Sequence, residues 1–175
     1  MSRAVLTDDL ADDQLLLDLL NSTPTTDGVP TDELDDETAA RAWQKAHGGR
    51  GTPAELERMR EARGLLQAVV RGEVSPTALA PLMDKVSYRP AVTDEGLAWN
   101  LEVGTDDELA VRALLAWDRL RQTAPGRLRP CANDECTLFL LDRSKANTAR
   151  WCSMAVCGNR MKARRHYQRR RTTQS

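Results

Sequence analysis

The sequence CANDECTLFLLDRSKANTARWCSMAVCGNRMKARRHYQRRR occupies residues 131–171 and contains all four cysteines of the chain and its densest run of positive charge. The cysteines form two pairs of identical C-x4-C spacing, Cys131 with Cys136 and Cys152 with Cys157, and fifteen residues separate the pairs. Two such pairs beside turn-forming residues can place four thiolates around one tetrahedral Zn²⁺ ion. The stretch therefore predicts a structural zinc site that supports the basic segment following it.

Two disulfides, or four unconnected buried thiols, are the alternatives to a metal site. The segment MSRAVLTDDLADDQ at residues 1–14 lacks the apolar centre of a secretory signal, and no apolar run is long enough to cross a bilayer. We therefore expect a cytoplasmic protein without a membrane role, in which paired cysteines more often hold metal. A catalytic zinc ion is not expected, because four thiolates leave no open position for water.

The order of residues around the cysteines predicts the shape of this module. Cys136 leads into the apolar TLFLLD, then into the polar RSKAN and then into TARWC, which predicts a short hairpin between two metal half-sites. Cys152 and Cys157 lie at the beginning of a helical run. Turn, hairpin and ligand-bearing helix together predict a small treble-clef-like four-cysteine zinc finger that ends in a basic helix.

Charge is divided unevenly along the chain. Residues 1–126 carry 13 Lys+Arg and 23 Asp+Glu, a net charge of −10, whereas residues 127–175 carry 12 Lys+Arg and 3 Asp+Glu, a net charge of +9. A basic cluster of this kind can neutralise several phosphates, and arginine suits both phosphate oxygens and guanine edges. The predicted DNA-binding residues are Arg150, Asn159, Arg160, Lys162, Arg164, Arg165, Tyr167, Arg169, Arg170 and Arg171. The alternative is a solvated tail that docks on the acidic part of the chain.

Residues 1–126 are predicted to form an acidic, mainly helical α+β domain. Helices are expected at residues 8–21, from Thr31 to Ala46, and at residues 52–70 behind a Thr52 cap and a Glu55 capping box. In the first helix, the apolar face is predicted to consist of Leu10, Leu16, Leu17 and Leu20. A short or kinked helix should follow Ser75, because Pro81 interrupts it.

Two further elements complete this predicted domain. Strict alternation of Leu97, Trp99, Leu101 and Val103 predicts a strand with one buried face, in a β-hairpin that turns at residues 94–96. A capping box at residues 105–108 should open a long core helix that runs to about Gln122. The break at residues 123–126 then predicts two domains, residues 1–126 and residues 127–175.

The stretch from Arg129 to Lys162 closely resembles the bacterial CGNR zinc-finger family. The resemblance rests on WCSM at residues 151–154 and CGNR at residues 157–160, within a longer shared motif. The segment LDLLNST at residues 17–23 is similar to the family's LDLVNT opening, although Ser22 is inserted. The resemblance implies an N-terminal ABATE-type domain of stress-induced transcription regulators, four cysteine ligands for zinc, and DNA binding by the finger.

These observations favour a bacterial, nucleoid-associated transcription regulator that binds DNA through the finger and its basic helix. A second hypothesis is a factor whose acidic domain contacts RNA polymerase or a sigma factor while the finger assists promoter binding. The resemblance also suggests a small-molecule effector for the N-terminal domain. No enzymatic role is expected, because the sequence shows neither a catalytic constellation nor a phosphate-binding loop.

Overall fold

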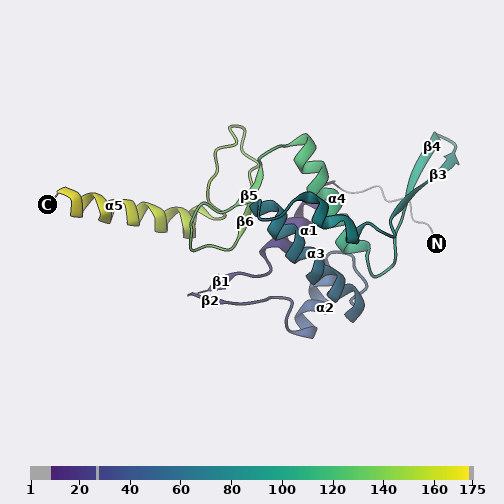
Figure 1. Cartoon of the computed structure of the whole chain (residues 1–175), viewed down its shortest axis with the longest axis horizontal. Helices are drawn as coiled ribbons and strands as arrows, with labels where there is room; N and C mark the ends of the chain where they lie inside the picture. Colours follow the sequence, from purple (N-terminus) through teal and green to yellow (C-terminus); the bar gives the residue numbers. More distant parts are fainter. Residues whose placement is uncertain (1–8, 27, 174–175) are drawn as a thin grey trace.

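Helices α1, α3 and α4 pack together as the centre of the molecule in the computed structural model, which describes residues 9–26 and 28–173 (Figure 1). Along the chain, the elements are α1 (Asp9–Asn21), β1 (Thr25–Thr26), β2 (Val29–Pro30), α2 (Glu37–Ala46), α3 (Pro53–Arg71), the 3₁₀-helix η1 (Pro76–Leu82), β3 (Ser87–Thr93), β4 (Gly96–Glu102), α4 (Glu108–Thr123), β5 (Leu128–Pro130), β6 (Phe139–Leu141), the π-helical turn η2 (Met154–Gly158) and α5 (Asn159–Thr173). The strands among the described residues form three two-stranded antiparallel sheets. The predicted α+β, mainly helical fold class is confirmed.

Helix α1 lies against α4 and buries the leucine pairs Leu15–Leu16 and Leu19–Leu20 completely. Leu16 and Leu20 were predicted to be on this face, but Leu10 is exposed and Leu17 only half-buried. The pairs recur four residues apart, which is the spacing that keeps side chains on one helix face. The apolar face is therefore centred closer to the C-terminal end of α1 than the sequence suggested.

Ion pairs accompany this leucine contact between α1 and α4. The buried carboxylate of Asp12 accepts hydrogen bonds from Arg112 Nε and Nη2 at 2.8 and 2.7 Å, and Asp13 binds Arg119. Hydrogen bonds and a paired cation reduce the free-energy cost of burying a charge. The acidic start of α1 therefore has defined partners on α4 as well as a favourable place at a helix N-terminus.

Two predicted helix starts differ in outcome. The Thr52 cap of α3 is confirmed, since its hydroxyl accepts from the backbone N of Glu55 at 3.1 Å. The Glu55 carboxylate does not close the predicted capping box, because it is buried and accepts from Gly51 N and Gln44 Nε2 at 2.9 and 2.8 Å. Helix α2 begins at Glu37 rather than Thr31, behind an Asp36 cap.

The capping box predicted at residues 105–108 is wrong. Helix α4 begins at Glu108, and its cap residue Asp107 makes no side-chain capping bond. Asp107 instead pairs with Arg58, and Asp106 accepts a hydrogen bond from the Thr52 hydroxyl at 2.7 Å. Asp106 and Asp107, the two acidic residues inside the predicted capping box, are thus bound by residues at the start of α3 and within it.

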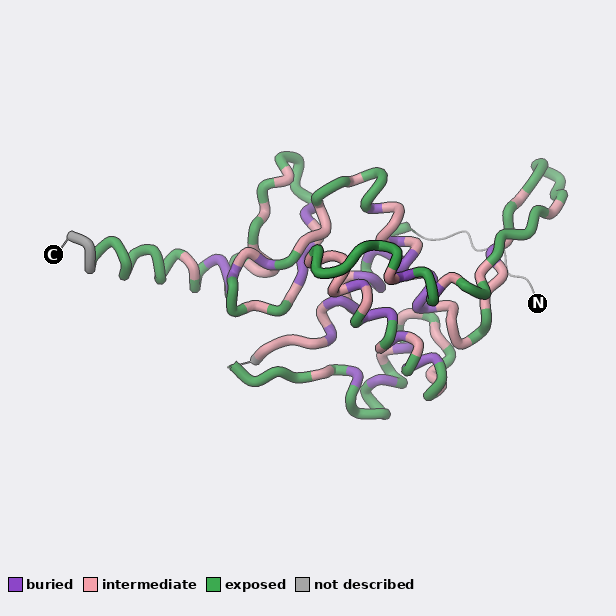
Figure 2. Tube along the Cα trace, in the orientation of Figure 1, coloured by how far each residue is buried: buried purple, intermediate pink, exposed green. Residues whose placement is uncertain are grey.

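The β3–β4 hairpin forms in the predicted place, but it projects from the helices (Figure 1). Its strands are paired from Ser87–Glu102 at the foot to Thr93–Gly96 at the turn. The prediction of one buried face is wrong, because Leu97 and Trp99 are 69% and 61% exposed and only Leu101 is buried (Figure 2). None of the described helices is both long and apolar enough to span a membrane.

Candidate metal centre and basic helix

Strands β5 and β6 pair in antiparallel register and hold the first two cysteines in the loop that joins them. Cys131 follows Pro130 at the end of β5, and its backbone N donates to Leu138 O at 2.8 Å. A turn bond from Cys136 N to Asn133 O, also 2.8 Å, brings Cys136 back toward Cys131. The predicted hairpin therefore surrounds the first cysteine pair and does not lie between the two pairs, because residues 128–130 supply its first strand.

The four thiol groups meet at one point. The sulfur atoms of Cys131, Cys136, Cys152 and Cys157 all lie within 4.8 Å of one another, and Cys152 Sγ is 3.7 Å from Cys136 Sγ and from Cys157 Sγ. A disulfide bond requires sulfur atoms about 2 Å apart, so these thiols are not joined. Tetrahedral Zn–S bonds of about 2.3 Å place neighbouring sulfurs about 3.8 Å apart. The donor set and its spacing fit a structural zinc ion.

Donor groups from the surrounding backbone and side chains point at these sulfurs. Asn133, which is fully buried, donates from Nδ2 to Cys157 Sγ, and the backbone N of Cys152 donates to Cys131 Sγ, both at 3.5 Å. Such bonds stabilise negative charge on sulfur and orient the ligand. Burial raises the pKa of Cys157, but the bond from Asn133 and contacts with the other thiols lower the pKa overall.

Two of the other thiols, those of Cys136 and Cys152, have a raised pKa. Burial raises the pKa of Cys136 to about 11, and burial together with the neighbouring Cys136 raises the pKa of Cys152 further. The thiols of Cys136 and Cys152 therefore resist ionisation unless a cation compensates their charge. Because zinc binds thiolates, metal binding here would release protons.

Asp142 organises the loop that joins β6 to the second cysteine pair. Its buried carboxylate accepts from Arg129 Nη2, Ser144 N and Ala149 N, each at 2.8 Å. The hydrogen bond from Ser144 is the largest influence lowering the pKa of Asp142, which falls to about 2. One side chain thereby holds both ends of the 143–149 loop and returns the chain to the metal centre.

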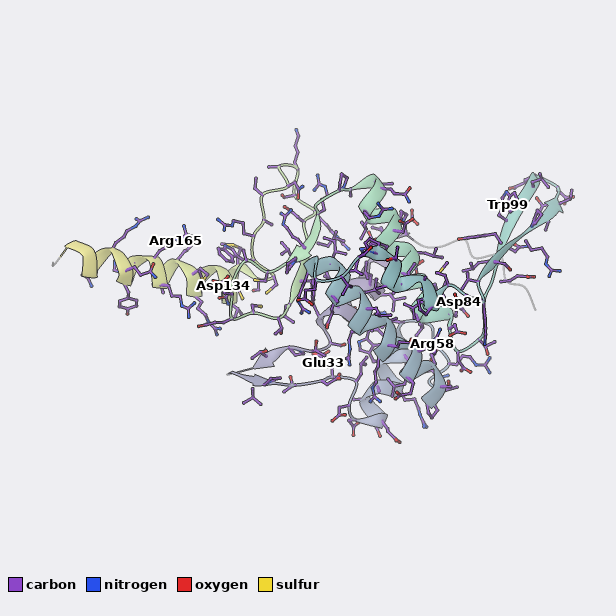
Figure 3. All side chains as sticks on the ribbon, in the orientation of Figure 1. Glu33, Arg58, Asp84, Trp99, Asp134 and Arg165 are labelled. Carbon is purple, nitrogen blue, oxygen red and sulfur yellow. The ribbon has the colours of Figure 1, made fainter. Side chains whose placement is uncertain are left out.

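The second cysteine pair leads directly into the basic helix. The hydroxyl of Ser153 accepts from Val156 N at 3.3 Å and opens η2, which contains Cys157 and continues into α5. Residues 159–170 of α5 are exposed except for the half-buried Met161. The helix extends away from the acidic helices, and Arg165 points outward from it (Figure 3). Residues 159–170 therefore do not adopt the alternative of a tail docked on the acidic part of the chain.

The predicted DNA-binding residues are distributed as follows. Asn159 begins α5 and donates from Nδ2 to Ala155 O at 3.2 Å, while Arg164 forms an ion pair with the finger's own Glu135. Arg150 precedes the helix and places its guanidinium 5.4 Å from the ring centre of Trp151. The side chain of Arg171 lies outside the described part of the chain. Of the predicted residues, those exposed on α5 are Asn159, Arg160, Lys162, Arg164, Arg165, Tyr167, Arg169 and Arg170.

Sequence reasoning missed the residues that attach the finger (residues 127–173) to the body (the described part of residues 9–126). Asn21 Oδ1 accepts from Phe139 N at 2.7 Å, and Asn21 Nδ2 donates to Phe139 O at 3.2 Å. The Phe139 ring is 1% exposed within the core of the body, and Arg71 lies 4.8 Å over it. Thr137 also donates to Thr23 O at 3.0 Å. Asn21 belongs to the LDLLNST motif, which was the available signal.

Fold and site together define a mainly helical protein with an attached four-cysteine finger. Residues 127–170 match the family model described as "CGNR zinc finger", and residues 13–134 match ABATE, described as "Putative stress-induced transcription regulator". The chain therefore belongs to the ABATE family, with a CGNR zinc finger at the C-terminal side of that region. A search of curated proteins finds no match.

Proposed function

We propose that this protein regulates transcription by binding DNA through α5, with one Zn²⁺ ion holding the finger in shape. The observation that carries the proposal is the exposed basic helix. It has seven Lys and Arg residues and no Asp or Glu within Asn159–Thr173. A solvated, uniformly basic helix that extends from an acidic body is suited to a polyanion.

The arrangement of charge on α5 favours a groove of double-stranded DNA. Side chains three, four or seven residues apart share a helix face. Arg160 and Arg164 therefore lie on one side of α5, and Lys162, Arg165 and Arg169 lie on the other. A helix of 15 residues is about 22 Å long, and its diameter of about 10–12 Å fits the major groove, which is about 12 Å wide. Cations on both sides would then reach the phosphates of both strands.

The proposed role of zinc is to fix the direction of this helix. Cys157 lies in η2, immediately before α5, while Cys131 and Cys136 lie in the β5–β6 loop. An ion bound by both parts supplies a rigid connection between the body-attached hairpin and α5. Because four thiolates would complete its coordination, the ion's contribution would be structural.

DNA binding can be tested by fluorescence anisotropy with a labelled duplex across a range of salt concentrations. We expect binding at low salt that weakens steeply as salt rises, because bound phosphates release counterions. The double variant Arg164→Ala with Arg165→Ala should bind at least about tenfold more weakly and reduce the log–log salt slope by about 2. Absence of binding at low salt, or an unchanged variant, contradicts the proposal.

A matched control is the double variant Lys85→Ala with Arg89→Ala. Both cations are exposed near the β3–β4 hairpin, at the opposite end of the molecule from α5 (Figures 1 and 2). The control removes the same formal charge and should retain the salt slope. Equal losses in both variants would mean that net charge, rather than α5, determines binding.

In a second proposed function, the body binds an RNA polymerase subunit or a sigma factor. The net charge of −10 over residues 1–126 favours this arrangement, since it suits a basic protein surface. Affinity capture with purified polymerase, with and without promoter DNA, tests this directly. Capture that requires promoter DNA would favour DNA binding as the primary activity.

A further inference from the structure

One face of the β3–β4 hairpin consists entirely of apolar side chains. The directly opposed pairs Tyr88–Leu101, Pro90–Trp99 and Val92–Leu97 alternate with the pairs on the other face. Directly opposed residues in an antiparallel pair project to the same side of the sheet. The opposite face carries the polar or small pairs Ser87–Glu102, Arg89–Asn100 and Ala91–Ala98. The hairpin is therefore amphipathic.

The apolar face is exposed in the monomer. Tyr88 is 52%, Val92 85%, Leu97 69% and Trp99 61% exposed, and Trp99 is seen on the projecting hairpin (Figure 3). With whole aromatic side chains of about 150–250 Å², Tyr88 and Trp99 expose roughly 200 Å². Val92 and Leu97 add an area on the order of 200 Å². A contiguous apolar patch of this size on a soluble protein commonly marks an interface.

The backbone of the hairpin also requires support. A two-stranded hairpin is at best marginally stable in water, and stability usually needs a third strand or a packed face. Leu101 supplies burial at the foot of the hairpin. Packing of the outer apolar pairs against another surface would supply the rest of the stabilisation that the hairpin needs.

We infer that the apolar faces of two β3–β4 hairpins pack on each other and form a two-fold symmetric homodimer. None of the six side chains that form this face carries a charge, so the two hairpin faces bring no like charges together. An identical apolar face is complementary to itself about a two-fold axis. Pro90 and Trp99 form the middle pair, and so Trp99 lies nearest the axis.

The apolar area that two hairpins can bury against each other suits a weak dimer, in equilibrium with its monomers. The four most exposed side chains of both copies together contribute roughly 800 Å². With Pro90 and the rim of the hairpin, this approaches the roughly 1,000 Å² from which specific interfaces begin. Aromatic residues such as Trp99 at the centre are typical of such interfaces.

This arrangement leaves both basic helices accessible. The hairpin and α5 lie at opposite ends of the longest axis of the molecule (Figure 1). Association through the hairpins therefore places the two α5 helices at the two far ends of an elongated dimer. The inference does not depend on the proposed function, since it concerns a different surface.

Sedimentation equilibrium of the full chain at about 1–200 µM tests the inference. We expect a monomer–dimer equilibrium that persists between 0.1 and 1 M NaCl, because apolar association is not screened by salt. Leu97→Ser with Trp99→Ser should shift the chain to monomer, weakening association at least about tenfold. The control Ala98→Ser with Asn100→Ser changes the opposite face of the same strand and should leave the dimer intact.

Far-UV circular dichroism of both double variants checks that the helices remain folded. A wild-type chain that stays monomeric at every concentration overturns the inference and indicates that another molecule, or another part of the chain, covers the face. A dimer that survives Leu97→Ser with Trp99→Ser also overturns it. A dimer that dissociates in 1 M NaCl overturns it as well, in favour of association between α5 and the acidic body.

Discussion

Asn21, the last residue of α1, forms two hydrogen bonds with the backbone of Phe139 in β6, although 118 positions separate them in the chain. The amide side chain pairs with Phe139 as the backbone of a neighbouring strand would, because it accepts from the N–H of Phe139 and donates to the carbonyl of Phe139. Removing it leaves both backbone groups without their partner in a partly buried place.

Replacement of Asn21 by Ala should therefore lower the free energy of unfolding by about 1–3 kcal/mol. Urea unfolding followed by circular dichroism measures this change, and limited proteolysis should show earlier cleavage within residues 127–158. Asn100→Ala, on the hairpin, is the matched control. If proteolysis of Asn21→Ala follows the wild-type course, the two hydrogen bonds do not secure the finger.

The metal centre should contain one zinc ion per chain, measured by elemental analysis. Cys157→Ser should lose most of this zinc, since three thiolates and a hydroxyl bind it more weakly. Asn133→Ala removes the side-chain bond to Cys157 but keeps all four ligands. We expect it to retain zinc while its affinity for the ion falls about tenfold in competition with a chelator. Zinc content unchanged in Cys157→Ser would contradict the assigned ligand set.

The stability of the finger should depend on pH because of Asp142. Its pKa is lowered to about 2 from the usual 3.8, so ionised Asp142 favours the folded state. This contribution is complete above about pH 4 and is lost as the pH falls from about 4 through 2. Urea unfolding of Asp142→Asn and wild type at pH 6 and pH 3 should show a difference that shrinks at pH 3. The exposed control Asp134→Asn should differ little from wild type at either pH.

Glu55 should tolerate loss of its negative charge poorly. Its carboxylate accepts from two backbone N–H groups, of Arg50 and Gly51, and from Gln44 Nε2. In Glu55→Gln, an NH₂ group replaces one acceptor oxygen and faces these N–H donors. The substitution should therefore lower the free energy of unfolding by about 1–3 kcal/mol. The control Glu57→Gln removes an exposed partner of Arg60 and should cost less than about 1 kcal/mol. Thermal unfolding of both variants measures these changes. Equal losses of stability in the two variants would contradict the role assigned to Glu55.

The ion pair between Glu135 and Arg164 should modestly restrain binding of DNA to α5. Glu135→Ala releases a cation and removes a negative charge beside the helix. Because surface pairs contribute at most about 1 kcal/mol, affinity should increase no more than about fivefold. Anisotropy titrations at low salt measure this, with Asp94→Ala at the hairpin tip as control. Weaker binding by Glu135→Ala would show that the pair positions Arg164 for DNA.

The sequence was sufficient for features that depend on neighbouring residues. The spacing of the cysteines predicted their meeting point, and Thr52 followed by Pro53 predicted the start of α3. The hairpin was found from its turn and alternation, but alternation identifies an apolar face without identifying what covers it. Trp99 was therefore assigned to a core from which it projects.

Features that depend on distant residues could not be predicted in this way. Asp106 and Asp107 have the local composition of a helix cap, yet Thr52 and Arg58 bind them across the fold. The two hydrogen bonds of Asn21 to Phe139 likewise join positions whose proximity is set by the packing of α1 against β6. Local propensity cannot report such pairings, since each requires the finished tertiary structure.

The place of Phe139 also has a consequence for protein engineering. Its ring belongs to the core of the body, although its strand carries the loop that holds two of the cysteines. A finger transplanted onto a foreign protein would take this ring with it, leave a hole in the donor and expose a hydrophobic residue in the recipient. Chimaeras in this family should therefore exchange α1 and the finger together, because each contributes side chains to the contact between them.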